Sequence, residues 1–469
     1  MEKTVKKVSA LDFFCIGFGA IVGVGWAVSI NNWMIGSGGP LPASIGYLAA
    51  MIMMIPIALT YCELVPMFPE AGGGMVYAHK AFGRTVALFS GWAAFGAFVA
   101  IIPWEAIQIT SMLGYLIPGL TAGTPLYTLY GTDIYLSTIL IGTAFSLLLY
   151  LLNRRGLAAA ARVQKILCLL LVGSAVVAAA AALCAGGVEN LKPLYEKVSQ
   201  ESSHRHFFGG VLAILATAPF FLSGFETIPQ GVEEAGGDLK KVGKTVVLSV
   251  SMACVFYALL LFCFGAAMPW KEFIALDKPV AAVLFRHIYG GVWGNIFYWM
   301  IIIGAIAGLL TTWNGFFAAS ANLLMAMGRK GLIPRVFSRQ NKNDVAVNGL
   351  LVCLALSLAL SLTGPFLGEG LVDTLTCFSA AAFVLSWMIT AFSLVRLRYT
   401  MPDAHRPYRI PGGTAMGWFA SLLAAAVFVL LLIPGNPVYM GRKSAIAFAV
   451  WMAVGIVLYM VNRTTEKVD

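Results

Sequence analysis

Long apolar runs that are almost free of charge recur along this chain. Hydrophobic residues make up 59% of its 469 positions and charged residues only 11%, which is outside the usual composition of soluble globular proteins. About 20 apolar residues cross the roughly 30 Å hydrocarbon core of a bilayer as one helix, so each run predicts a transmembrane helix. The sequence therefore predicts an all-α integral membrane protein.

We predict twelve such helices. The first run is too long for the apolar part of a signal peptide and has no small-residue cleavage site after it, so we expect it to remain in the mature protein. The predicted helices cover residues 10–35, 41–66, 88–118, 134–153, 166–186, 207–232, 245–270, 290–327, 346–364, 371–395, 414–434 and 444–461.

Basic residues are concentrated in alternate loops. If the basic start with Lys3, Lys6 and Lys7 is cytoplasmic, most of the 31 lysines and arginines lie on the cytoplasmic side, as the positive-inside rule requires. We therefore expect both termini in the cytoplasm and the protein in the plasma membrane, with the lipid bilayer as a partner. The sequence has no patch of basic and aromatic residues of the kind that binds nucleic acid, so we do not expect nucleic acid as a partner.

The sequence shows no pattern typical of a catalytic or cofactor site. Its cysteines and histidines form no cluster with metal-ligand spacing, and no nucleophile, base and acid occur together. A phosphate-binding Gly-x-x-x-x-Gly-Lys-Ser/Thr loop is also missing. We therefore expect no cofactor, no metal, no enzymatic activity and no direct use of ATP.

Four glycines lie close together in the first predicted helix, in the stretch GFGAIVGVGW at residues 17–26. Gly19 and Gly23 alone would make a G-x-x-x-G face for a neighbouring helix. With Gly17 and Gly25 they cannot share one face, and each glycine costs about 1 kcal/mol in a helix interior relative to alanine. This favours local unwinding, which a membrane tolerates only where the backbone lines a cavity or is buried in protein.

A second interrupted segment occurs five helices later, as expected for a transporter built from inverted repeats. Pro219, Gly224 and Pro229 break the sixth run, and Glu226 lies between them. An ionisable residue at membrane depth indicates a functional site. The alternative is a structural hydrogen bond within the bundle.

The third predicted helix carries another carboxylate, Glu105, next to Trp104 and two residues after Pro103. A carboxylate beside an aromatic face suits a positively charged ligand. Alternatively, Glu105 fills a backbone gap opened by Pro103, or pairs with Gln108.

Five motifs in order resemble the amino acid-polyamine-organocation superfamily of secondary transporters. They are GAIVGVG at residues 19–25, ELVPMFPEAGG at 63–73, GFETIPQGVEEA at 224–235, MGRKGLIPRVF at 327–337 and HRPYRIPGG at 405–413. The resemblance implies two inverted repeats of five helices, with helices 1 and 6 discontinuous, plus two extra helices. The first repeat would cover residues 1–186, the second 187–395, and the extra helices with a short tail 396–469.

The resemblance also implies a substrate site at the two breaks. Backbone N–H groups at Ile21, Val24 and Gly25 would bind a substrate carboxylate, in keeping with the positive end of a helix. Residues Phe220, Ser223 and Phe225 would offer carbonyls to the substrate amine and an aromatic gate, Phe316 would line the site, and Glu226 would take and release a proton. The third helix would add Trp104 and Glu105.

Two departures from the family pattern, and one pair of hydroxyl groups, bear on substrate and coupling. Val24 replaces a serine or threonine, which weakens binding of a free carboxylate. Some proton-coupled members carry a lysine at the position near Leu171. Thr311 and Thr312 offer hydroxyls for sodium, although threonine in a membrane helix usually bonds its own backbone. Coupling to protons or to sodium stays open.

The leading prediction is a secondary active transporter that moves an amino acid by alternating access, with coupling to protons. The alternative within transport is a carrier or exchanger of cationic amines or polyamines. A solute sensor on the same scaffold is the alternative from another class, but it would normally carry a soluble output domain.

Overall fold

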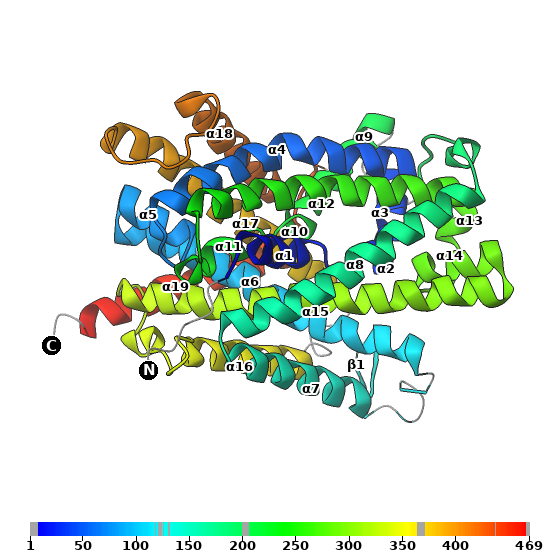
Figure 1. Ribbon diagram of the computed structural model, residues 1–469, viewed down its shortest axis with the longest axis horizontal. Helices are drawn as coiled ribbons and strands as arrows, with labels where there is room; N and C mark the ends of the chain where they lie inside the picture. Colours follow the sequence, from blue (N-terminus) through cyan, green and yellow to red (C-terminus); the bar gives the residue numbers. More distant parts are fainter. Residues whose placement is uncertain are drawn as a thin grey trace.

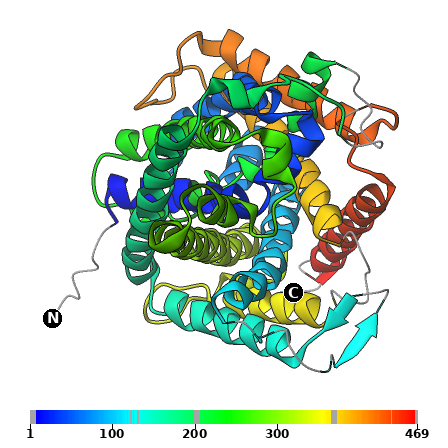
Figure 2. The same cartoon turned by 90° about the vertical axis from the view of Figure 1, so that its right-hand side faces the viewer.

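A computed structural model describes residues 8–117, 119–120, 124, 126–129, 132–198, 206–363, 371–436 and 438–465. The predicted cytoplasmic residues Lys3, Lys6 and Lys7 lie outside these ranges. Within them, the chain is a bundle of helices that run along the long axis of the molecule (Figure 1), and Figure 2 shows many of them end-on.

The fold is helical apart from one short hairpin. Strands β1 (Tyr127–Leu129) and β2 (Thr132–Ile134) pair antiparallel. The α-helices are α1 (Ala10–Ile21), α2 (Gly25–Val28), α3 (Ile30–Ser37), α4 (Pro40–Met67), α5 (Gly74–Phe82), α6 (Arg84–Leu116), α7 (Leu136–Asn153), α8 (Leu157–Ala185), α9 (Phe207–Ala213), α10 (Ala218–Phe221), α11 (Thr227–Gln230), α12 (Leu239–Ala267), α13 (Trp270–Ile274), α14 (Val280–Tyr289), α15 (Gly291–Arg329), α16 (Val347–Thr363), α17 (Leu371–Thr400), α18 (Gly413–Leu432) and α19 (Arg442–Thr465). Short 3-10 helices are η1 (Val188–Leu191), η2 (Ile214–Ala216), η3 (Val232–Glu234) and η4 (Arg335–Ser338).

Nine helical segments in the described ranges are long and apolar enough to cross a membrane. Each of them corresponds to one of the twelve predicted runs, and three predicted runs have no such segment. The runs at 134–153 and 346–364 form the shorter apolar helices α7 and α16. The run at 207–232 is divided into short helices with a break between α10 and α11.

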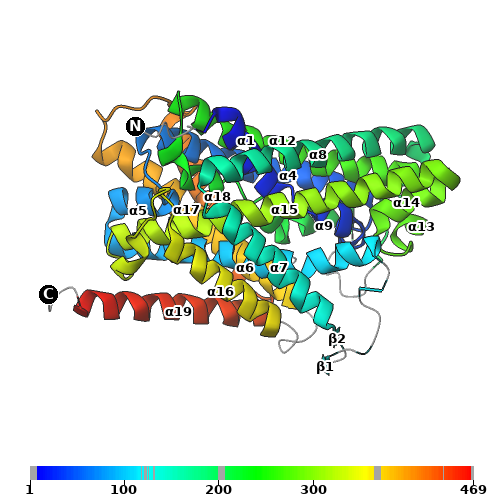
Figure 3. The same cartoon turned by 60° about the horizontal axis from the view of Figure 1, so that its bottom comes forward.

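The basic loops gather at one end of the bundle, around Gly331. The Gly331 carbonyl accepts hydrogen bonds from Arg84, the first residue of α6, and from Asn462, near the end of α19. Lys330, the residue before Gly331, contacts Glu70 at 2.6 Å. The hydrogen bond from Lys330 and the positive charges of Lys330 and Lys80 lower the pKa of the Glu70 carboxyl, although partial burial acts in the opposite direction. We call this the basic end; in Figures 1 and 3 it is the end that carries α5.

The start of the described chain is at the same end. The backbone N–H of Val8 donates to the Glu234 carbonyl at 3.0 Å, and the N–H of Gly236 donates back to the Val8 carbonyl at 2.9 Å. Glu233 accepts from the backbone of Ala71 and forms an ion pair with Arg329 at 2.9 Å. The N-terminal end of α1 and the C-terminal end of α19 therefore both lie at the basic end.

A buried carboxylate joins α4, α17 and the loop that follows α17. Glu63 is fully buried and contacts Arg398 at 2.5 Å and Arg406 at 3.2 Å, and it accepts from the backbone N–H of Ile410 at 2.9 Å. A buried carboxylate is tolerated when it is paired and hydrogen-bonded. The Glu63 motif and the HRPYRIPGG motif are thus parts of one structural contact.

Helix α19 is attached to α6 by a reciprocal pair of tryptophans. The rings of Trp92 and Trp451 stack at 4.7 Å, and each indole N–H donates to the backbone carbonyl of the other residue. Gly96 and Gly455 make room, because a Cβ at either position would lie 2.3 Å from a ring. The rest of α19 is largely exposed, since only 11% of its membrane-length window is buried in the protein.

Candidate functional site

The first helix break falls at residues 22–24, between α1 and α2. The N–H groups of Val24, Gly25 and Trp26 donate to no acceptor in the described part of the chain. Unpaired backbone groups at membrane depth need partners. The break therefore offers donors that a ligand can use.

The four glycines of this segment serve close packing rather than unusual backbone angles. None of them has a positive φ. A Cβ at Gly23 would lie 2.6 Å from the Thr312 hydroxyl, and one at Gly25 would lie 2.9 Å from the Phe221 ring. The unwinding predicted from the glycines occurs, and in the structure their physical role is to let neighbours approach.

The second break covers residues 222–226, between α10 and α11. The carbonyls of Phe221, Leu222 and Ser223 accept no hydrogen bond from described residues, whereas the Phe220 carbonyl accepts from Ser223 and the Phe225 carbonyl from Ile228. Unpaired carbonyls are suited to bind a cation or an ammonium group.

Gly224 brings the two breaks together. Its φ is +132°, and a Cβ there would lie 2.6 Å from the carbonyl carbon of Ala20 and from the backbone nitrogen of Ile21. Only glycine adopts this conformation easily while approaching another backbone so closely. Residues of both breaks, including Val24, Gly25, Phe221 and Ser223, thus lie around one space.

A small central cavity of about 20 Å³ lies where the breaks meet. Its space is close to that of a single water molecule, so the site is closed in this conformation. Eight of the ten predicted site residues line it: Ile21, Val24, Gly25, Trp104, Glu105, Phe220, Ser223 and Phe316.

The other two predicted residues, Phe225 and Glu226, lie behind the cavity wall. The Phe225 ring stacks on Trp387 at 5.5 Å and meets Tyr61 edge-on at 5.3 Å. Glu226 is buried and accepts from the Gly224 backbone at 2.7 Å and from the Trp387 indole. Its carboxylate therefore links the second break to α17 rather than facing the cavity directly.

Glu105 is the buried carboxylate that faces the cavity. It is 2% exposed, and it has neither an ion pair nor a hydrogen bond among the described residues. In particular, Gln108 lies on another cavity and does not pair with it. An unpartnered polar group at this depth is costly, so a ligand that supplies a donor or a positive charge would be stabilised here.

Sequence reasoning missed two aromatic residues of the cavity wall. Tyr257 of α12 donates its hydroxyl to the Ile21 carbonyl at 3.0 Å, which fixes the first break. Phe221 packs against Gly25 and meets Trp33 at 4.8 Å. A tyrosine inside an apolar run was the available signal for Tyr257; Phe221 has no such signal, because its neighbours come from other helices.

The two threonine hydroxyls considered for sodium binding already donate hydrogen bonds to backbone carbonyls. Thr311 donates to the Gly308 carbonyl of its own helix at 2.7 Å, and Thr312 donates to the Gly19 carbonyl at 3.2 Å. Leu171 is fully buried, near Gly308. Thr312 therefore joins α15 to α1 next to the first break.

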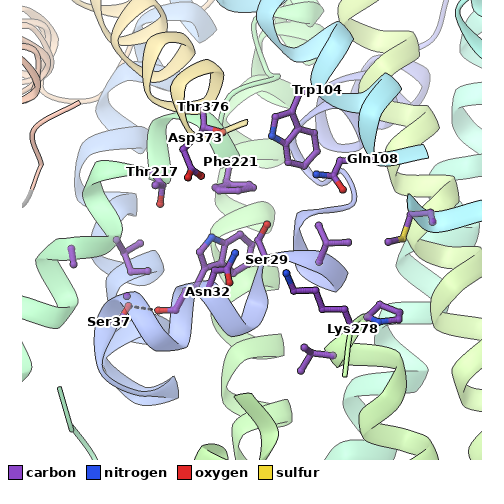
Figure 4. Close-up of a pocket in the computed structure, with 18 of the residues that line it drawn as sticks. Ser29, Asn32, Ser37, Trp104, Gln108, Thr217, Phe221, Lys278, Asp373 and Thr376 are labelled. Carbon is purple, nitrogen blue, oxygen red and sulfur yellow. Dashed lines mark hydrogen bonds between the residues drawn. The ribbon is translucent and has the colours of Figure 1, made fainter. Parts of the chain in front are cut away.

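A larger cavity of about 490 Å³, the outer cavity, is lined by residues of α3 and of the segment before α14 (Figure 4), and these elements lie at the end of the bundle away from α5 (Figure 1). Trp104 and Phe221 line both this cavity and the central one. Asn32, Lys278 and Asp373 are among its other lining residues. The two aromatic side chains therefore separate the outer cavity from the centre.

At the basic end, an inner cavity of about 360 Å³ contains Glu233, Glu234 and Asp344. Burial, together with the neighbouring carboxylates of Asp344 and Glu233, raises the pKa of Glu234 to about 7. The ion pair of Glu233 with Arg329 borders this cavity.

The chain is similar in sequence to known permeases and transporters. The sequence profile of the amino acid permease family matches residues 8–460. The branched-chain amino acid permease BcaP of Bacillus subtilis (strain 168) is 24% identical over all of this chain and 96% of its own length. The aspartate-proton symporter of the same organism is 24% identical over 90% of this chain and 78% of its own. The polyamine transporter PUT1 of Oryza sativa subsp. japonica is 26% identical over all of this chain and 80% of its own.

The match extends across both helix breaks, the Glu63 motif and the loops of the basic end. Membrane-length helices account for most of the described chain. The chain is a multi-pass membrane protein that belongs to the amino acid permease family, within the amino acid-polyamine-organocation superfamily.

Proposed function

We propose that this protein is a secondary active transporter that carries amino acids across the plasma membrane by alternating access. The observation that carries the proposal is the meeting of two helix breaks at one cavity, where unpaired N–H groups of Val24 and Gly25 face unpaired carbonyls of Phe221 and Ser223. A substrate with a carboxylate and an ammonium group can satisfy both sets. The names of the relatives support amino acids as the substrate class.

The proposed architecture has twelve transmembrane helices. Helices 1–5 and 6–10 would form inverted repeats over residues 1–186 and 187–395, with two further helices over 396–469. The breaks in the first and sixth helices support this division, because inverted repeats place such breaks in corresponding positions. The basic end would face the cytoplasm, in line with the positive-inside rule.

Proton coupling through Glu226 is part of the proposal. Its carboxylate bonds both the second break and Trp387 of α17, so a change in its charge would alter the contact between these elements. Sodium coupling has less support, because the hydroxyls of Thr311 and Thr312 already donate to backbone carbonyls.

Uptake into proteoliposomes tests the proposal. We expect the purified protein to accumulate at least one of radiolabelled leucine, alanine, aspartate and lysine when an inward proton gradient is imposed, and to lose accumulation when an ionophore removes the gradient. Uptake of none of the four would contradict amino acid transport, and uptake that ignores the gradient would contradict proton coupling.

A second candidate function is transport of cationic amines or polyamines. The unpaired carboxylate of Glu105 in the cavity wall favours it, and one relative carries the name polyamine transporter. Leaving one member of a buried charge pair without its partner costs about 3–5 kcal/mol. For a cationic substrate, Glu105→Gln should therefore raise the KM at least tenfold.

Competition experiments with the proton gradient in place separate the two candidates. Each amino acid is compared with its decarboxylated amine, in the wild type and in Glu105→Gln. The exposed Glu272→Gln serves as the matched control at the far end from the basic loops. Equal KM values in the wild type and Glu105→Gln for every compound would make Glu105 a structural residue, and a wild type in which no amine competes would remove the amine candidate.

A further inference from the structure

The outer cavity is lined by one basic and one acidic side chain that lack partners in the described part of the chain. Lys278, just before α14, and Asp373, in α17, both line it, and neither forms an ion pair or hydrogen bond with any described residue. In Figure 4 the amino group of Lys278 points toward the middle of the cavity, and Asp373 lies on the other side in that view. Both charged groups are therefore available to a ligand in the cavity.

The other lining residues suit a small organic molecule. Trp33, Trp104 and Tyr115 supply aromatic surface, and Asn32 and Ser29 supply polar groups. About 490 Å³ is within the range of small-molecule sites. The cavity therefore combines apolar walls with one positive and one negative group.

The outer cavity also leads to the central site. Trp104 and Phe221 form part of both walls. The Trp104 ring lies 5.7 Å from Phe220, and Phe220 lies 5.1 Å from Phe221. These aromatic rings therefore lie between the outer cavity and the helix breaks.

We propose that the outer cavity is a separate binding site for amino acids on their way to the central site. Lys278 binds the substrate carboxylate and Asp373 binds its ammonium group. Lys278 thereby favours amino acids over their decarboxylated amines before either reaches the helix breaks. This inference rests on the proposed transport function and adds a second site to it.

Substitutions of charge with matched controls test the outer site. Lys278→Gln is compared with Lys271→Gln. Lys271 lies nearby in α13, but it pairs with Glu196 and does not line the cavity. Asp373→Asn is compared with Asp277→Asn. Asp277 is exposed, precedes Lys278 in the sequence and does not line the cavity. Lys278→Arg keeps the charge and serves as the conservative variant. Melting temperature and gel filtration establish that each variant is folded.

Initial uptake rates of leucine, alanine, aspartate, lysine and putrescine are measured for each variant. Since an exposed charge pair contributes little and is screened by salt, we expect Lys278→Gln to raise the KM for amino acids about three- to tenfold at low ionic strength, with unchanged maximal rate. The KM for putrescine should not rise. Lys278→Arg and both controls should behave like the wild type.

The results separate the two proposals. If the wild type carries leucine, alanine, aspartate or lysine but Lys278→Gln has the KM of Lys271→Gln, the outer site is wrong while amino acid transport stands. An Asp373→Asn variant with unchanged KM for every compound would exclude its role with ammonium groups. A wild type that carries none of the four amino acids would overturn the transport function and the outer site with it.

Discussion

At the scale of single residues, the buried carboxylates differ in what surrounds them. Glu63 is paired with two arginines, Glu226 accepts two hydrogen bonds, and Glu105 has no partner among the described residues. The same residue type therefore serves as a structural tie, a linker between elements and an open position in a cavity wall. The sequence indicated Glu105 and Glu226 as carboxylates at membrane depth and gave Glu63 only as part of a motif, and it could not separate the surroundings of the three.

Glu226→Gln should abolish the pH dependence of uptake while the protein still folds. The amide keeps one of the two acceptor oxygens that bond Gly224 and Trp387, so we expect a loss of about 1–3 kcal/mol of stability. Uptake rates between about pH 5 and 8 give the measurement. Trp387→Phe, which keeps the carboxylate, should retain a pH dependence. An unchanged pH profile in Glu226→Gln would remove this residue from the coupling role.

Glu234→Gln should make the melting temperature less sensitive to pH. Burial and the neighbouring carboxylates raise the pKa of Glu234 in the folded state to about 7, above its ordinary value of 4.5. Between these two pH values the folded state therefore holds a proton that the unfolded state has lost. Stability from this group is full below about pH 4.5 and falls as the pH rises through about 7. The difference between wild-type and variant melting curves measures it, and a difference that is constant with pH would contradict the raised pKa.

At the scale of helices, the apolar runs predicted most elements, and charge explains where their ends were misplaced. The fifth run was predicted from residue 166, but α8 begins at Leu157. Arg162 and Lys165 interrupt the apolar pattern there, although long basic side chains can reach the aqueous boundary from within a helix, and Lys165 pairs with Asp12. Hydropathy alone does not reveal such helix ends.

Gly224→Ala should separate the two helix breaks. The added Cβ would collide with the backbone of Ala20 and Ile21, which cannot move as a flexible side chain can, and the φ of +132° is strained for alanine. We expect a loss of roughly 3 kcal/mol or more of stability, with loss of uptake. Gly173→Ala is the control, because a Cβ there meets nothing within 4 Å. A Gly224→Ala protein with a wild-type melting temperature and uptake would contradict the close approach.

The break in the sixth run was predictable from Pro219, Gly224 and Pro229, but its contacts were not. Which carbonyls stay unpaired depends on local turns, such as the hydrogen bond from Ser223 to Phe220. The position of Phe225 depends on Trp387, which comes from a helix far along the chain. Sequence patterns give the location of a break, and packing between distant helices decides which of its groups remain available.

At the scale of the whole molecule, the described structure places the outer and inner cavities at opposite ends with the central site closed between them. The inner side is held by the contacts of Glu233 and Lys330. The sequence predicted the alternation of loops, since the positive-inside rule needs only charges. It did not predict the cavities, because their walls combine residues from helices that are far apart along the chain.

Thiol labelling in intact cells tests the orientation. In a Cys184→Ser background, which removes the exposed native cysteine, Glu272→Cys should react with a membrane-impermeant maleimide. Lys342→Cys, in the loop near the basic end, should react only after the cells are permeabilised. The reverse pattern would place the basic end outside the cell.

The tryptophan pair between α6 and α19 has a mechanical consequence. Two indole-to-backbone hydrogen bonds and a ring stack join α19 to α6, so α19 cannot slide along α6 without breaking both bonds. Because α6 also carries Trp104 and Glu105 to the cavity, a displacement of α6 in the proposed transport cycle would move α19 through the surrounding lipid. We therefore expect the rate of transport to depend on the viscosity of the bilayer.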